Sequence, residues 1–76
     1  MIKKGLFIQL VGLLSANVVY EFVKDTGIDY TTAFNTFYSS DTYRKLEDRR
    51  TRYWRESAQY IYESLYRELH GLPIND

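Results

Sequence analysis

Apolar residues recur at helical spacing through the first third of the chain. The face that they define carries Phe7, Leu10, Val11, Leu14, Val18 and Phe22, widened by Leu6, Leu13 and Val19. This period predicts a helix over residues 2–24 that other elements cover on most sides. Gly12 lacks a side chain, and we expect it to let another helix cross closely. Gly27 ends the helix, because glycine takes the left-handed conformation that a C-cap requires.

Three shorter helices are predicted downstream. They cover Tyr30 to the Ser39-Ser40 break, residues 41–47 and residues 58–69. The residues directly before these three helices are Asp29, Ser40 and Ser57. Their side-chain oxygens suit the N-cap position, where such oxygens accept hydrogen bonds from the exposed backbone amides of the first turn. Residues 47–55 show no clear period and are interpreted as a loop.

The composition fits one small helical domain. The chain has 76 residues and no cysteine, so neither disulfides nor thiolate metal sites can supplement its core. Eight Tyr, four Phe and one Trp offset the small size, because each aromatic ring buries a large area. We therefore expect a single all-α domain over residues 1–76, folded as a small four-helix bundle with a central N-terminal helix.

The N-terminal segment has two other interpretations. Lys3 and Lys4 precede the apolar run LFIQLVGLL, as the charged and apolar regions of a signal peptide do. The length of this segment would also suit a membrane span. The polar residues Gln9, Ser15, Asn17 and Glu21 interrupt the apolar pattern on different sides of a helix, which favours a buried core helix. We expect a cytoplasmic protein without membrane contact.

Positive charge gathers in one segment of a chain whose net charge is zero. Residues 44–55, RKLEDRRTRYWR, hold six of the ten basic residues and the only tryptophan. Such a segment can contact phosphates and stack on bases, or meet the carboxylates of a partner protein. The candidate partner-binding residues are Arg49, Arg50, Arg52, Tyr53, Trp54, Arg55 and Tyr60. For Trp54 we favour an inward position between the first and fourth helices, which would leave the arginines solvated or paired with nearby acids.

No arrangement for catalysis or metal binding stands out. His70 is the only histidine and falls at the predicted end of the fourth helix, where its ordinary role is to interact with the last carbonyls. The chain has no glycine-rich phosphate loop and no metal-ligand spacing. We therefore expect a protein that is not an enzyme, has no catalytic residues and needs no cofactor or metal.

One sequence pattern extends over residues 22–69. The residues that carry it are Gly27, Ile28, Ala33, Phe34, Phe37, Ser40, Thr42, Tyr43, Trp54, Ser57, Tyr60 and Ile61. In these positions the chain resembles a family of short, functionally uncharacterised bacterial helical proteins. The resemblance implies an all-helical bacterial protein without a known activity, from a group sometimes found in gene sets like those of toxin–antitoxin modules. The loop RRTRYW departs from the more acidic loop expected of such relatives, which puts a shared partner surface there in doubt.

The leading hypothesis is a non-enzymatic protein-interaction module, in one form an accessory or antitoxin-like component. Self-association is also expected, because the acidic fourth helix of one copy could meet the basic segment of another. The alternative is a small nucleic-acid-binding regulator that uses residues 44–55. That alternative is disfavoured, because a dedicated nucleic-acid binder shows a wider basic excess, and Glu47 and Asp48 oppose the positive charge here.

Overall fold

The described part of the chain is entirely helical. A computed structural model describes residues 2–74 and contains no strand in that range. Its helices are α1 (Lys4–Thr26), α2 (Tyr30–Tyr38), α3 (Asp41–Leu46) and α4 (Ala58–Leu69), with short 3-10 helices η1 (Arg49–Thr51) and η2 (Tyr53–Arg55) between α3 and α4. The prediction of an all-α domain with four α-helices is confirmed, and the predicted bounds agree with the observed ones to within about two residues.

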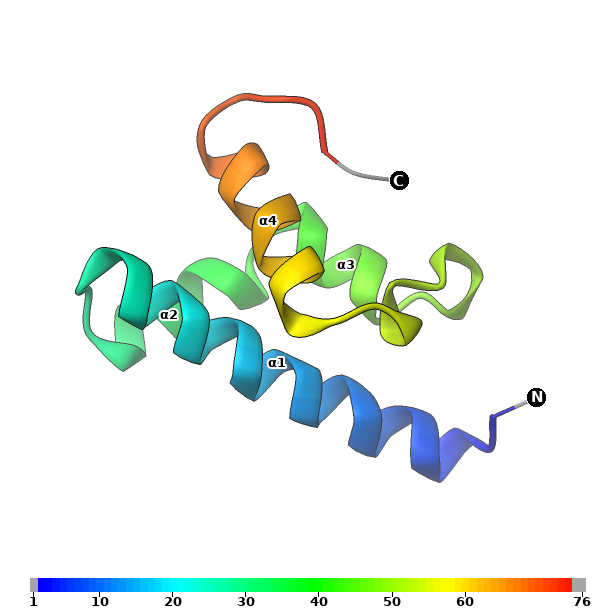
Figure 1. Cartoon of the computed structure of the whole chain (residues 1–76). Coiled ribbons are helices and arrows are strands. Elements are labelled where there is room, and N and C mark those ends of the chain that lie inside the picture. The colour runs from blue at the N-terminus through cyan, green and yellow to red at the C-terminus, as the bar shows by residue number, and fades with distance from the viewer. Residues whose placement is uncertain (1, 75–76) are drawn as a thin grey trace.

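The longest helix, α1, runs along the lower edge of the molecule, and α3, α4 and the turns between them lie above it (Figure 1). It packs against α2 and α4, while α3 packs against α4. One face of α1 stays open, since Leu6 is 55% and Leu13 is 62% exposed. The expectation that other elements cover this helix on most sides is therefore wrong. Three short helices are too small to surround a helix of 23 residues.

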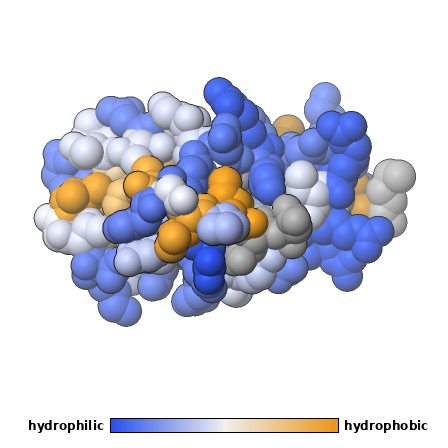
Figure 2. All heavy atoms as spheres, turned by 90° about the horizontal axis from the view of Figure 1, so that it is seen from above, coloured by the Kyte–Doolittle hydropathy of each residue, from blue (hydrophilic) through white to orange (hydrophobic). Residues whose placement is uncertain are grey.

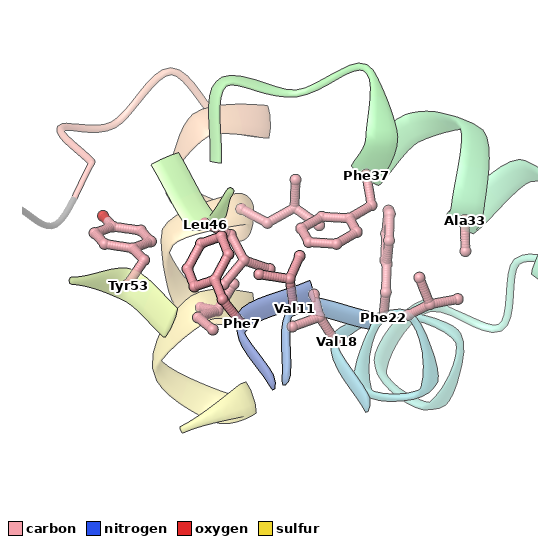
Figure 3. Close-up of a cluster of buried hydrophobic side chains, with 11 residues drawn as sticks. Phe7, Val11, Val18, Phe22, Ala33, Phe37, Leu46 and Tyr53 are labelled. Atoms are coloured by element: carbon pink, nitrogen blue, oxygen red, sulfur yellow. The ribbon is translucent and has the colours of Figure 1, made fainter. Parts of the chain in front are cut away.

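The core lies between α1 and the elements above it. It consists of Phe7, Val11, Val18, Val19, Phe22, Ala33, Phe37, Leu46, Tyr53, Ile61 and Leu65. Figure 3 shows the labelled side chains of α1 directed toward Phe37 and Leu46. Val18 and Val19 are wholly buried. Each contributes about 1.5–3 kcal/mol relative to an exposed position, so the centre of α1 anchors the fold.

Length and composition alone would allow α1 to cross a membrane. It is the one helix with these properties among the residues that the structure describes, and 39% of its apolar stretch is buried in this fold. Core helices of small domains share the same length and composition, so this property does not separate the two roles. The cytoplasmic location stays a prediction.

The helix starts and the first helix end follow local chemistry. Asp29, Ser40 and Ser57 each accept a hydrogen bond from the backbone amide three residues ahead, at 3.2, 3.0 and 3.1 Å. Gly27 has φ 78°, and its amide donates to the Val23 carbonyl at 2.8 Å. The three predicted N-caps and the predicted C-cap are all confirmed, because each depends only on residues a few positions apart.

A carboxylate from α4 holds the first turn of α3. The Glu68 carboxylate accepts hydrogen bonds from the amide of Asp41 at 2.8 Å and from the amide of Thr42 at 2.9 Å. The hydroxyl of Thr42, a residue that is wholly buried, donates to the same carboxylate at 2.8 Å. First-turn amides lack partners within their own helix, so Glu68 satisfies donors that α3 itself cannot. We call this arrangement the Glu68 clamp.

We predict that Glu68→Ala lowers the free energy of unfolding by about 2–3 kcal/mol. The reason is the loss of three hydrogen bonds to a charged acceptor. Glu63 is a matched control on the same helix, since its carboxylate forms only an exposed ion pair with Arg67 at 3.2 Å. Glu63→Ala should cost only a few tenths of a kcal/mol. Urea denaturation of both variants measures the difference, and equal losses would contradict the role of the clamp.

A second prediction concerns Gly12, where the sequence suggested a close helix crossing. That expectation is wrong, because a Cβ at Gly12 would meet no atom within 4 Å. Gly12→Ala should therefore stabilise the fold by about 0.5–1 kcal/mol through better helix propensity. Gly27→Ala is the control: its Cβ also meets nothing, but its φ of 78° disfavours any side chain. In thermal unfolding, the midpoint temperature should rise for Gly12→Ala and fall for Gly27→Ala. A lower midpoint temperature for both variants would contradict the prediction.

Candidate functional site

The basic segment, residues 44–55, is more ordered than the predicted loop. It includes the end of α3 and the two 3-10 helices η1 and η2, which meet at Arg52. Arg52 has φ 63°, a left-handed conformation that is unfavourable for a residue with a side chain. The Asp48 carboxylate caps η1 by accepting from the Arg50 amide at 3.0 Å, and the Thr51 hydroxyl donates to the Asp48 carbonyl at 2.9 Å. Short-range hydrogen bonds therefore fold the segment onto itself.

The two aromatic residues of this segment face inward. Tyr53 is 2% exposed, and its hydroxyl shares a hydrogen bond of 2.8 Å with the Ser64 hydroxyl on α4. The Trp54 indole donates to the Arg49 carbonyl at 2.9 Å and packs edge-on against Phe7, with ring centroids 5.9 Å apart. Trp54 is half-buried beside the core, as the favoured interpretation expects. The buried Tyr53 ring offers no open face on which nucleic-acid bases could stack.

Several basic side chains of the segment interact within the molecule. Arg44 pairs with Asp41 at 2.7 Å. The guanidinium of Arg50 donates to both carboxylate oxygens of Asp48 at 3.0 and 2.9 Å, and these bonds lower the pKa of Asp48. The ammonium of Lys45 lies 5.7 Å from the centre of the Tyr53 ring. Internal partners thus reduce the positive charge that this segment presents.

The remaining arginines differ from one another in setting. The Arg49 guanidinium lies over the Phe7 ring at 4.7 Å and donates to the Ile2 carbonyl at 3.3 Å. Arg52 and Arg55 are exposed and form no ion pair with another described residue. The end of the molecule that holds η1 and η2 is largely hydrophilic when seen from above (Figure 2).

The tyrosines of α4 divide between core and surface. Tyr60 is half-buried, with its ring edge-on to Tyr53 at 5.8 Å. The Tyr62 hydroxyl donates to the Asp25 carboxylate at 2.6 Å, and burial followed by this bond raises the pKa of Tyr62. Tyr66 is 42% exposed and stacks on His70 at 4.0 Å. Of these three rings, that of Tyr66 is therefore the one most available to a partner.

The surface has an open groove that the sequence did not reveal. It has a volume of about 710 Å³ and runs beside the N-terminal half of α1. Its lining residues are Lys4, Phe7, Ile8, Val11, Gly12, Ser15, Tyr38, Tyr43, Glu47 and Arg49. Of the predicted contact residues, only Arg49 lines it. Lys4, Ile8 and Gly12 are spaced four residues apart, next to the apolar face of α1 that enters the core. This spacing was the one signal in the sequence that could have indicated the groove.

The groove joins an apolar floor to a polar rim. Tyr38 and Tyr43 lie against each other edge-on at 4.8 Å and form part of the wall opposite α1. Burial, and then the nearby charge of Glu47, raise the pKa of Tyr43. The Tyr43 phenol, like an ordinary tyrosine at neutral pH, carries a proton that it can donate in a hydrogen bond. Lys4, Glu47 and Arg49 place both signs of charge along the rim.

Ser15 is the unusual residue of the groove. It is 1% exposed, and its hydroxyl has no hydrogen-bond partner among the described residues. A buried hydroxyl without a partner costs about 1–3 kcal/mol. Because Ser15 lines the groove, an occupant with a polar group could supply the missing bond.

Comparisons with known proteins do not place the chain in a family. No protein-family model, no curated protein and no solved structure matches it. The candidate site therefore rests on the geometry of this molecule.

We predict that Arg52→Gly leaves the free energy of unfolding unchanged or raises it by up to about 1 kcal/mol. Glycine relieves the left-handed strain at this position, although it also increases the entropy of the unfolded chain. Arg55→Gly is the control, because Arg55 is also exposed, forms no ion pair with another described residue and lies in η2 without a positive φ. In urea denaturation of both variants, the free energy of unfolding of Arg55→Gly should fall by about 0.5–1 kcal/mol. A larger loss for Arg52→Gly than for Arg55→Gly would contradict the assignment of strain.

Proposed function

We propose that this chain is a non-enzymatic protein-interaction module and that the groove beside Arg49 receives its partner. The observation that carries the proposal is an open, largely apolar groove lined in part by Ser15, whose hydroxyl has no hydrogen-bond partner in the described part of the chain. Binding pockets commonly combine an apolar surface with a few polar groups that fix orientation. We also propose that the helices form a small four-helix bundle organised on α1, which presents the floor of this groove.

The partner that fits best is a protein segment with apolar side chains and an acidic residue. The apolar side chains would cover Ile8 and Val11, and the carboxylate would meet Arg49. The Arg49 side chain is already positioned by Phe7 and by the Ile2 carbonyl, so little conformational entropy is lost when it binds. A guanidinium also forms strong charge-assisted hydrogen bonds to carboxylates.

The nucleic-acid alternative has less support. Phosphate binding needs several free cations on one face, because each contact contributes modestly. Arg44 and Arg50 are paired with acids, and Tyr53 is buried. Arg52 and Arg55, even together with Arg49, would neutralise about three phosphates, which favours weak, salt-sensitive binding.

The setting that we propose is the bacterial cytoplasm. The resemblance to short bacterial helical proteins supports this setting, and it makes an accessory or antitoxin-like component one form of the module. A partner encoded beside this chain would fit that form.

The test places a photo-cross-linking amino acid at Ile8, inside the groove, or at Asn35, an exposed residue of α2 outside it. Irradiation in the source cells should produce an adduct with one other protein from position 8 and not from position 35. Gly12→Arg should abolish the adduct by filling the groove. Gly5→Arg is the matched control, because its Cβ site is equally open but does not line the groove. An adduct that survives Gly12→Arg, or that forms equally from both positions, would contradict the proposal.

A further inference from the structure

The face of α1 turned away from the fold carries a regular row of side chains. Leu6, Leu10, Leu13, Asn17 and Tyr20 follow one another at alternating steps of four and three residues. Leu6, Leu13 and Tyr20 are 55%, 62% and 51% exposed, although two of them are leucines. We call these five residues the outer seam. At helical spacing they lie far around α1 from the groove residues, and α3 and α4 lie on the other side of the helix (Figure 1).

The period of the outer seam indicates what covers it. Alternating steps of three and four average 3.5 residues, the repeat by which two helices pack along their length. A lipid surface would not favour the polar Asn17 within the row. A single asparagine does occur in the seams of paired helices, at a cost in stability. The row therefore fits another helix better than it fits a membrane.

We infer that the outer seam binds a second copy of this chain, with the two α1 helices antiparallel. A two-fold axis at the middle of the outer seam would place Leu10 of each copy against Leu13 of the other. Farther from the axis, Leu6 of each copy would face Asn17 of the other. The contact is self-complementary, as a two-fold interface must be. It is independent of the groove and of the partner proposed to bind there.

Charge selects the antiparallel arrangement. Lys3 is the N-cap residue of α1, and Glu21 lies near the end of this helix. A parallel pair would bring Lys3 of both copies together, and Lys24 would also meet its own copy. An antiparallel pair instead places Lys3 of one copy near Glu21 of the other. It also sets the positive end of each helix dipole beside a negative end.

The size of the seam indicates a weak, reversible dimer. From Leu6 to Tyr20 it spans about 21 Å at 1.5 Å per residue. Two helices in contact over this length bury less surface than the roughly 1,200 Å² of a stable complex. We expect a dissociation constant on the order of 10–100 μM, so the dimer forms only in concentrated solution or alongside a second contact.

The first experiment is sedimentation equilibrium of the full chain from about 1 μM to about 1 mM, a range that brackets this affinity. Leu13→Glu should raise the dissociation constant at least about tenfold, because it buries a charge in the contact. Ile8→Glu is the matched control: Ile8 is 60% exposed on the same helix but lines the groove, and the change should be less than about twofold. A strictly monomeric parent, or equal effects of both variants, overturns the inference. Circular dichroism checks that both variants fold.

The second experiment tests the orientation. The chain has no cysteine, so Leu6→Cys and Asn17→Cys each introduce a single thiol. Under mild oxidation, the antiparallel pair predicts a disulfide-linked dimer mainly when the two variants are mixed. Efficient linkage of either variant with itself overturns the antiparallel arrangement. Vesicles of phosphatidylcholine and phosphatidylglycerol complete the test: Leu13-dependent binding to them by a monomeric protein would assign the seam to a membrane and overturn the inference.

Discussion

The structure depends on one carboxylate that serves a helix other than its own. Glu68 lies in the last turn of α4, where the helix dipole disfavours negative charge. The same charge is favourable at the start of α3, where it meets the amides of Asp41 and Thr42 at 2.8 and 2.9 Å. The clamp fixes α3 against α4. It thereby places Leu46 in the core and Tyr43 in the wall of the groove.

Charge along the sequence is a poor guide to the charge that a partner meets. The basic segment contains six of the ten basic residues, yet Asp41 and Asp48 pair with Arg44 and Arg50 inside the molecule. Arg49 contributes differently, because contact with Phe7 holds it at the edge of an apolar groove. An ordered cation beside an apolar surface suits recognition of a protein segment better than general attraction to phosphates does.

Local chemistry made the helices predictable, whereas long-range contacts were not. The caps at Asp29, Ser40 and Ser57 each involve residues three apart, so the sequence alone locates them. The Glu68 clamp joins residues 26 and 27 positions apart, and no local pattern marks it. The groove was missed for the same reason, since it exists only where α1 meets the ends of α2 and α3. Arg49 was chosen for its charge, and its neighbours in the groove could be found only from the fold.

The most direct test of this account is hydrogen exchange of backbone amides in the native protein, measured residue by residue by NMR. The Glu68 clamp predicts that the amides of Asp41 and Thr42 exchange only through unfolding of most of the molecule. The amides of Tyr30 and Thr31 occupy equivalent first-turn positions in α2 and have no such acceptor, so they should exchange at least about 100-fold faster, which corresponds to about 2.7 kcal/mol. Equally fast exchange at all four amides would show that Glu68 does not hold α3, and the account of the fold and of its groove would fail.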